Sequence, residues 1–183
     1  MDNVEYQIPI ARLQSLKEGR LFYPCAGMDW HEPIELFHNW INEFWFVDTC
    51  YNQSLERNSG IKDFTRISLD RSEIDGRTIW SKEKYTIKIC HQQFEHSCTG
   101  KHINVYHCSG RGYDAFRSLI KLKNKRLSIF YYRGDSSGES GSGFYWLSRS
   151  TFKYVLEYIE DGGLVITDGS NSRGWKKLCR FHR

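Results

Sequence analysis

Hydrophobic residues along this chain come in short runs separated by polar turns. The run Leu21–Tyr23 is closed by Pro24 and Gly27, which predicts a buried strand with a turn at its end. From Asp29 to Asn42, apolar residues recur every three or four positions, which predicts a helix. Asp29 and Glu32 have the spacing of a capping box, so we expect this helix to begin at Asp29.

A second apolar run, Phe44–Val47, predicts another buried strand, and Asp48 stops it. Strand, turn, helix and strand within about thirty residues have the size of a parallel βαβ unit. Asp48 follows Gly27 by 21 positions (48 − 27). In dinucleotide-binding folds, an acidic residue about 20 positions after the glycine turn holds the ribose hydroxyls. An aspartate that merely starts a turn is the alternative interpretation of Asp48.

The remaining pattern predicts strands over 85–89, 103–106, 127–132 and 164–166, and helices over 113–122 and 152–159, the last one ended by Gly162 and Gly163. Strands alternate with helices at both ends of the chain, which is typical of an α/β fold. We therefore predict one domain over residues 1–183, a Rossmann-like, mostly parallel sheet flanked by helices. Residues 52–110 form a β-rich insertion or an antiparallel extension in this prediction.

Composition limits the classes of protein to which this chain can belong. It has 183 residues, enough for one sizeable core, and contains no apolar run as long as a membrane span. The N-terminal stretch MDNVEYQIPIARL has early acidic residues and lacks the apolar segment of a secretory signal. We therefore expect a cytoplasmic protein with no membrane partner, whose six cysteines are thiols.

Basic residues are unevenly distributed along the chain. There are 26 Lys and Arg against 22 Asp and Glu, a net charge of +4. Residues 117–126 and 173–183 each hold five Lys or Arg and no acidic residue. Such segments attract polyanions, so nucleic acid is a candidate partner, although a solvated helix face and a basic tail give the same pattern.

Three of the predicted strands end in polar loops, after Tyr23, Val47 and Tyr132. Ligands of open α/β sheets bind outside the carboxyl ends of the strands, so we expect these loops to converge in one crevice. Residues 133–143, rich in glycine and serine, would bring N–H groups and hydroxyls close to a polar ligand; a mobile surface loop is the alternative. The predicted ligand-binding residues are Tyr23, Pro24, Gly27, Asp29, Asp48, Arg133, Gly134 and Ser136. Asp135 and Glu139 are predicted to act as acid/base groups or to hold ribose hydroxyls.

Other candidate chemistry is less specific. Seven cysteines and histidines lie between residues 90 and 108, but their spacing fits a zinc site poorly, so we expect no metal. Cys25 is a candidate nucleophile at a helix start, with His31 or His38 as its base. Aromatic residues in the same loops, above all Trp30 and Trp146, could stack on a flat heterocycle.

The segments FYPCAGMDWHEPIELF, FWFVD, YYRGDSSGESGSGFYWL and GGLVITDGSN resemble a group of small, functionally uncharacterised bacterial and phage proteins. Their core is similar to the fold of class I S-adenosylmethionine-dependent methyltransferases. The resemblance implies a Rossmann-like sheet with an adenosine-type ligand near Gly27 and Asp48. This chain departs from those methyltransferases in two respects: Gly27 is the only glycine of the first turn, and the Asn/Asp-Pro-Pro-Tyr signature is absent.

Three functions stay open at this point. The chain could bind S-adenosylmethionine or another adenine nucleotide as a group transferase of methyltransferase-like type. It could instead bind or sequester a nucleotide or signalling molecule without turnover. The third hypothesis is nucleic-acid binding through residues 117–126 and 173–183.

Overall fold

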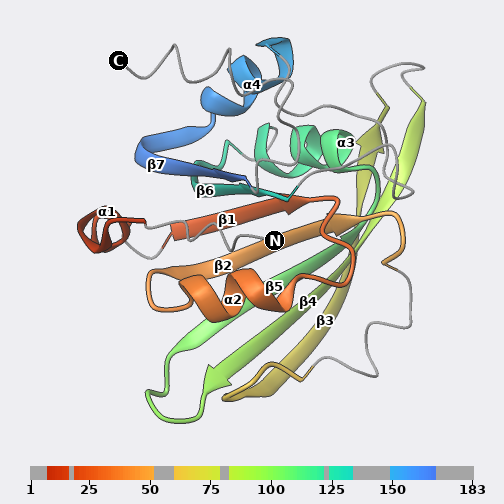
Figure 1. The fold of residues 1–183 in the computed structure, drawn as a ribbon. Helices are drawn as coiled ribbons and strands as arrows, with labels where there is room; N and C mark the ends of the chain where they lie inside the picture. Colours follow the sequence, from red (N-terminus) through yellow and green to blue (C-terminus); the bar gives the residue numbers. More distant parts are fainter. Residues whose placement is uncertain are drawn as a thin grey trace, which may run out of the picture.

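A single seven-stranded sheet runs through the molecule in the order β3-β4-β5-β2-β1-β6-β7 (Figure 1). The computed structural model describes residues 8–16, 19–51, 60–78, 83–121, 124–133 and 149–167. The strands are β1 (Gly19–Pro24), β2 (Ile41–Asp48), β3 (Phe64–Arg77), β4 (Lys84–His96), β5 (His102–Ser109), β6 (Leu127–Tyr132) and β7 (Ile159–Thr167). The structure therefore has a strand at each position where the sequence pattern predicts one.

Five neighbouring strands, β5, β2, β1, β6 and β7, are parallel, and β3 and β4 add an antiparallel hairpin at the β5 edge. The predicted α/β class with a mostly parallel sheet is confirmed. The antiparallel extension is shorter than residues 52–110, because β5 pairs in parallel with β2 from Glu43↔Asn104 to Asp48↔Ser109. Alternation of polar and apolar residues identifies a strand, but not the direction in which it pairs.

The direction of winding reverses between β1 and β6. From β1 the chain passes to β2, then out to the hairpin of β3 and β4 at the edge of the sheet, and back to β5 beside β2, so that all four strands lie on one side of β1. It then crosses to β6 on the other side of β1 and continues to β7 at the opposite edge. Because β1 and β6 are parallel neighbours, their carboxyl ends lie side by side.

Helices cover both faces of the sheet (Figure 1). On one face lie α1 (Ile10–Gln14) and α2 (His31–Phe37); on the other lie α3 (Gly112–Phe116), the π-helix η2 (Arg117–Lys121) and α4 (Arg149–Leu156). The central strands alternate between two cores, so that Leu21 and Tyr23 pack against α2 while Phe22 packs against α3. All six residues of β6 are buried, as expected for a parallel strand covered on both sides. Among the described helices, none has the length and apolar composition needed to cross a membrane.

Two helices have bounds that differ from the predicted ones, and α2 ends at Phe37 rather than Asn42 because β2 already begins at Ile41. α2 begins at His31 rather than Asp29, its N-cap is Trp30, and the predicted capping box does not form. The backbone N–H of Asp29 donates to the Ala26 carbonyl instead (3.1 Å), so a turn delays the start of the helix. α4 ends at Leu156, since Ile159 already begins β7, and Gly162 (φ +82°) lies inside that strand where its register against β6 shifts.

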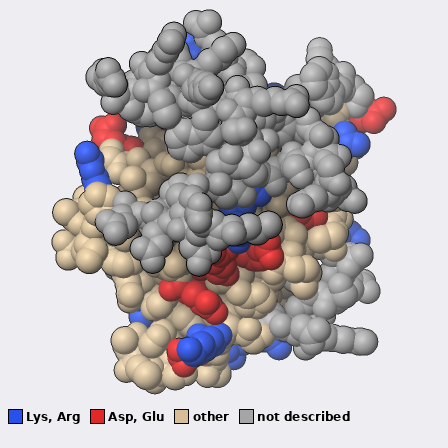
Figure 2. Space-filling view, in the orientation of Figure 1, with Lys and Arg blue, Asp and Glu red and all other residues tan. Residues whose placement is uncertain are grey.

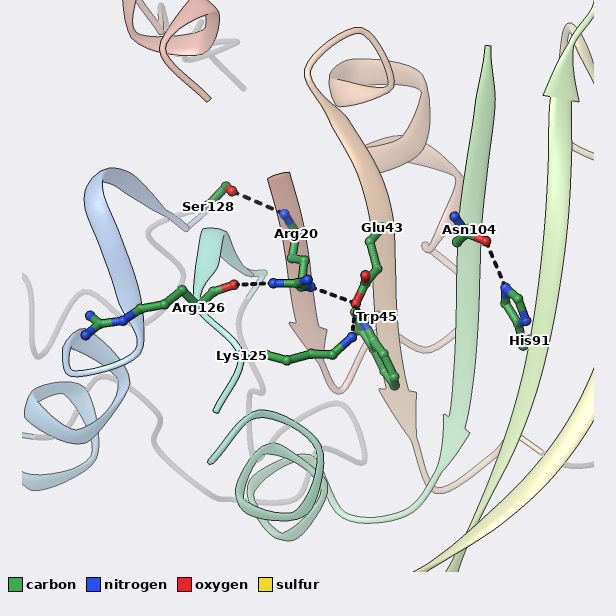
Figure 3. A network of polar contacts seen from close by, with 8 residues as sticks. All are labelled: Arg20, Glu43, Trp45, His91, Asn104, Lys125, Arg126 and Ser128. Carbon is green, nitrogen blue, oxygen red and sulfur yellow. Dashed lines mark hydrogen bonds and ion pairs between the residues drawn. The ribbon is translucent and has the colours of Figure 1, made fainter. Parts of the chain in front are cut away.

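A half-buried carboxylate ties together the amino ends of the central strands (Figure 3). Glu43 Oε1 accepts hydrogen bonds from Arg20 Nε (2.9 Å), Lys125 Nζ (2.7 Å) and Trp45 Nε1 (2.6 Å). The backbone N–H of Arg20 donates in turn to Ser128 Oγ (3.1 Å), so β1, β2 and β6 share one network. Burial would raise the pKa of Glu43, but the hydrogen bonds and charges of its partners outweigh it and lower that pKa.

We expect Glu43→Gln to lower the free energy of unfolding by about 2–3 kcal/mol at pH 7, because two partly buried cations would lose their shared counter-charge. Urea unfolding measures this difference. Glu73→Gln, on the exposed edge strand β3, is the matched control and should stay within about 0.5 kcal/mol of the wild type.

The pH dependence of the stability difference shows whether the charge of Glu43 or its packing is responsible for the effect of Glu43→Gln. The pKa of Glu43 is lowered in the folded state, so its stabilisation is present above the ordinary value of 4.5 and is lost as the pH falls through the folded value. The gap between wild type and Glu43→Gln should therefore shrink in acid. A gap of constant size down to pH 3 would show that packing, not charge, is responsible.

Candidate functional site

The carboxylate of Asp48 joins the loops that follow β1 and β2. Its Oδ2 accepts the N–H of Gly27 (2.9 Å), and its Oδ1 accepts the N–H of Cys50 (2.9 Å). Gly27 has φ +51°, a left-handed conformation that costs a residue with a side chain about 1–2 kcal/mol. The predicted pair of Gly27 and Asp48 is therefore in direct contact.

Gly27 is also held through its carbonyl. The hydroxyl of Tyr51 donates to the Gly27 oxygen (2.7 Å), and Tyr51 is buried against the loop. Burial, followed by the nearby charge of Asp48, raises the pKa of Tyr51, which keeps the hydroxyl a donor. No atom of the described residues lies within 4 Å of the position that a Cβ of Gly27 would take, so this part of the loop presents bare backbone.

The thiol of Cys50 belongs to the same group. Burial, and then the hydrogen bond and the charge of Asp48, raise the pKa of Cys50 to about 11. The thiol therefore stays protonated at neutral pH and adds to the donors that surround Asp48. Each carboxylate oxygen has two acceptor lone pairs, so Asp48 retains capacity for a hydroxyl group of a ligand.

At the reversal between β1 and β6, an ion pair links α2 to the residue that follows β6. Arg133, the residue after β6, donates from Nη1 to Glu32 Oε2 in the first turn of α2. Below the pair, the rings of Tyr23 and Tyr131 meet edge to face with centroids 4.9 Å apart. Burial and the neighbouring Tyr131 raise the pKa of Tyr23, although the positive charge of Arg133 opposes the shift.

The structure brings together the predicted site residues that it describes. Tyr23, Pro24, Gly27, Asp29, Asp48 and Arg133 all lie at or just beyond the carboxyl ends of β1, β2 and β6. Gly134, Asp135, Ser136, Glu139 and Trp146 lie outside the described residues, and so does the basic segment 173–183.

The sequence did not indicate Glu32 as part of this site, and it indicated Tyr51 only as one of the aromatic residues in these loops. Glu32 was interpreted as a capping residue, whereas its carboxylate faces the strand β6 a hundred residues away in the chain. Tyr51 follows Asp48 by three positions, close enough for the turn after β2 to return it to Gly27. No local signal indicates either contact, because both depend on which strands are neighbours.

A buried polar cluster lies beside these loops, under the start of α2. Trp30, predicted to stack on a ligand, is instead 1% exposed, stacks on His31 (3.5 Å between centroids) and meets His107 edge to face (4.6 Å). Trp30 Nε1 and His107 Nε2 are both buried without a hydrogen-bond partner among the described residues. A buried N–H that stays unsatisfied costs about 1–3 kcal/mol.

The tautomer of His107 follows from its neighbours. Arg66 Nη1 can only donate, so its contact with Gln92 Oε1 (3.3 Å) turns the amide NH₂ of Gln92 toward His107 Nδ1 (3.4 Å). Nδ1 is then the acceptor, and the imidazole proton lies on Nε2. Burial, with a smaller effect of His31, lowers the pKa of His107 to about 3.

The alternative chemistry receives little support from the described part of the chain. No group of three or more His, Cys, Asp or Glu side chains there could hold a metal ion. In the basic segment 117–126, Lys125 is bonded to Glu43. Arg126 donates to the carbonyls of Glu157 (3.3 Å) and Ile159 (3.5 Å). Lys125 is therefore already paired within the fold, whereas Arg126 makes its bonds at an exposed position.

We expect His107 to make the protein sensitive to acid. Its pKa is about 3 in the folded state against 6.5 ordinarily, so between these values the unfolded chain binds the proton and the folded chain does not. Stability should fall by up to about 1.4 kcal/mol for each pH unit below 6.5. His107→Gln keeps an acceptor for Gln92 and should flatten this slope in denaturant unfolding between pH 7 and 4. Equal slopes for the two proteins would contradict the assignment.

Comparisons with protein-family models, with curated proteins and with solved structures found no match to this chain. The functional assignment therefore depends on the geometry of the loops at the carboxyl ends of β1, β2 and β6.

Proposed function

We propose that this chain is a Rossmann-like domain that binds an adenine-containing or related nucleotide ligand, with S-adenosylmethionine the first candidate. One observation carries the proposal: the winding reverses between β1 and β6. Numbered in chain order, the five parallel strands have the order 3-2-1-4-5, the order of doubly wound nucleotide-binding sheets. Such sheets bind their ligands outside the carboxyl ends of the strands where the winding reverses.

The residues at this position fit an adenosine-type ligand. Within the described part of the chain, Gly27 has open space where a side chain would stand, which permits close approach of a ligand to the backbone. Asp48 can accept a ribose hydroxyl in addition to its two backbone partners. Tyr23 and Pro24 are buried at the end of β1 and would support the site from below, while Asp29 and Arg133 would face its charged groups. The resemblance of the sequence to methyltransferase-like proteins supports the same location.

Roles for the loop after β6 rest on the sequence alone. In the proposal, Gly134 and Ser136 offer N–H and hydroxyl groups to the ligand, and Asp135 and Glu139 serve as acid/base groups. S-adenosylmethionine, when bound, supplies a methyl group attached to a positively charged sulfur. The protein would then orient this cation near the carboxylates of Asp29 and Glu32 and the acceptor near the loop after β6.

A non-catalytic binding module is the second candidate. It is favoured by the state of the described carboxylates, since Asp48 and Glu32 already have partners that hold the loops in place. Binding then needs only donors, acceptors and a rigid frame. Recovery of the intact ligand after prolonged incubation distinguishes this candidate from a transferase, which would release a demethylated product.

A thermal-shift screen tests the proposal, using S-adenosylmethionine, S-adenosylhomocysteine, NAD, ADP-ribose and cyclic dinucleotides. A ligand at 100 times its Kd should add about 2.7 kcal/mol, a shift of several degrees for a domain of this size. Gly27→Ala should abolish the shift, because a methyl group would enter the space that the ligand approaches.

Gly100→Ala is the matched control. Gly100 also has a positive φ (+65°) and room for a Cβ, whose nearest neighbour would be Glu95 Oε1 at 3.7 Å, but it lies in the turn between β4 and β5. Both variants should lose about 1 kcal/mol of stability from backbone strain, and only Gly27→Ala should lose the ligand. If a ligand still raised the melting temperature of Gly27→Ala, the site would lie elsewhere. If no compound of the panel stabilised the wild type, a nucleotide ligand would be rejected.

A further inference from the structure

The ion pair between Glu32 and Arg133 joins α2 to the end of β6 at the reversal of winding. Glu32 belongs to α2, which follows β1, and Arg133 follows β6 directly. The guanidinium of Arg133 is a planar donor that binds carboxylates and phosphates in the same way, through paired N–H groups. Its present partner is therefore chemically equivalent to the anionic group of many small ligands.

This ion pair is open to exchange. The side chains of Arg133 and Glu32 are 39% and 45% exposed, so water reaches both of them. Exposed ion pairs contribute little to stability, because solvent screens the attraction and both side chains lose freedom. A competing oxyanion can reach the guanidinium without unfolding any described element.

The surroundings of Arg133 are acidic. Glu32 and Asp29 are its nearby carboxylates, and Tyr131 and Tyr23 lie next to it as well; after burial, which opposes the shift, Glu32 and these groups raise the pKa of Arg133. Acidic side chains also gather in the middle of the face that carries α2 (Figure 2). The surrounding negative charge repels anions. An anion therefore binds here only if it forms direct hydrogen bonds with the guanidinium of Arg133.

We propose that Glu32 is an internal competitor at the ligand site, occupying Arg133 until a carboxylate or phosphate group of a ligand displaces it. The proposal rests on the location given under the proposed function, but not on the ligand being a nucleotide. After displacement, the Glu32 carboxylate remains close to the bound anion and repels it. This repulsion prevents the binding of anions that interact only weakly with Arg133. Glu32 thereby selects for ligands whose oxyanion forms paired hydrogen bonds with Arg133.

The test is an anion titration of the full chain followed through the side-chain NMR signals of labelled arginine. Inorganic phosphate and acetate are the two probes, and the tighter binder identifies the oxyanion that the site prefers. Glu32→Gln removes the competitor and should tighten binding of the preferred probe roughly fivefold. Arg133→Gln should abolish binding, and the double variant should behave like Arg133→Gln.

Glu35→Gln is the matched control for charge. Glu35 lies on the same helix, is exposed, and loses the same charge, but it neighbours His31 rather than Arg133. It should remain within twofold of the wild type. If Glu35→Gln tightened anion binding as much as Glu32→Gln, the loss of any negative charge would explain the change and the proposal would be overturned. Weaker anion binding in Glu32→Gln would also overturn it.

The two proposals fail in different ways. Neither probe contains a base or a ribose, so a nucleotide screen without hits leaves the expected exchange at Arg133 unchanged. If nucleotide binding is lost in Gly27→Ala but unchanged in Glu32→Gln, the proposed function is supported. The proposal that Glu32 competes with the ligand is then rejected. Anion binding that persists in Arg133→Gln would place the anion elsewhere and overturn the inference directly.

Discussion

Parallel pairing of β1 with β2 on one side and β6 on the other is the interaction on which the rest of the structure depends. Leu21 and Phe22 have partners in both neighbours, and each of these residues is fully buried. Because both faces of this strand are covered, its backbone groups must be satisfied within the sheet. That requirement fixes the relative position of the loops after β1, β2 and β6, and with it the position of Gly27, Asp48 and Arg133.

The two ends of the parallel strands are built differently. At the amino end, one carboxylate with little exposure collects three donors, and the network connects strands that are distant in the chain. At the carboxyl end, glycine in a left-handed conformation, buried N–H groups without described partners and an exposed ion pair lie close together. Such features lower local stability, and proteins tolerate them mainly where function requires them. The stable amino ends of the strands thus hold in place the less stable loops at their carboxyl ends.

Local patterns predicted the elements better than their contacts. The bounds of β6 were predicted correctly because a continuous apolar run is what a strand buried on both faces requires. The pair of Gly27 and Asp48 was predicted from spacing, since a βαβ unit brings the two loops together. The start of α2, the direction of β5 and the contact of Glu32 with Arg133 were not, because each is decided by neighbours far away in the chain. Trp30 illustrates the same limit: an aromatic residue in a polar loop can be a ligand platform or a core residue, and only packing distinguishes the two.

The hairpin of β3 and β4 stands where a crossover helix would ordinarily join two parallel strands. Glu43 and Asn104 pair although they are 61 positions apart (104 − 43), whereas β3 pairs with β4, and β4 with β5, each the next strand along the chain. Contacts between strands close in sequence form in microseconds, and distant pairings must first overcome the entropy of closing a long loop. Folding can therefore assemble the three-stranded unit on its own and dock it as a preformed template, so that the slow step is the meeting of two sheets rather than the search of one strand for its partner.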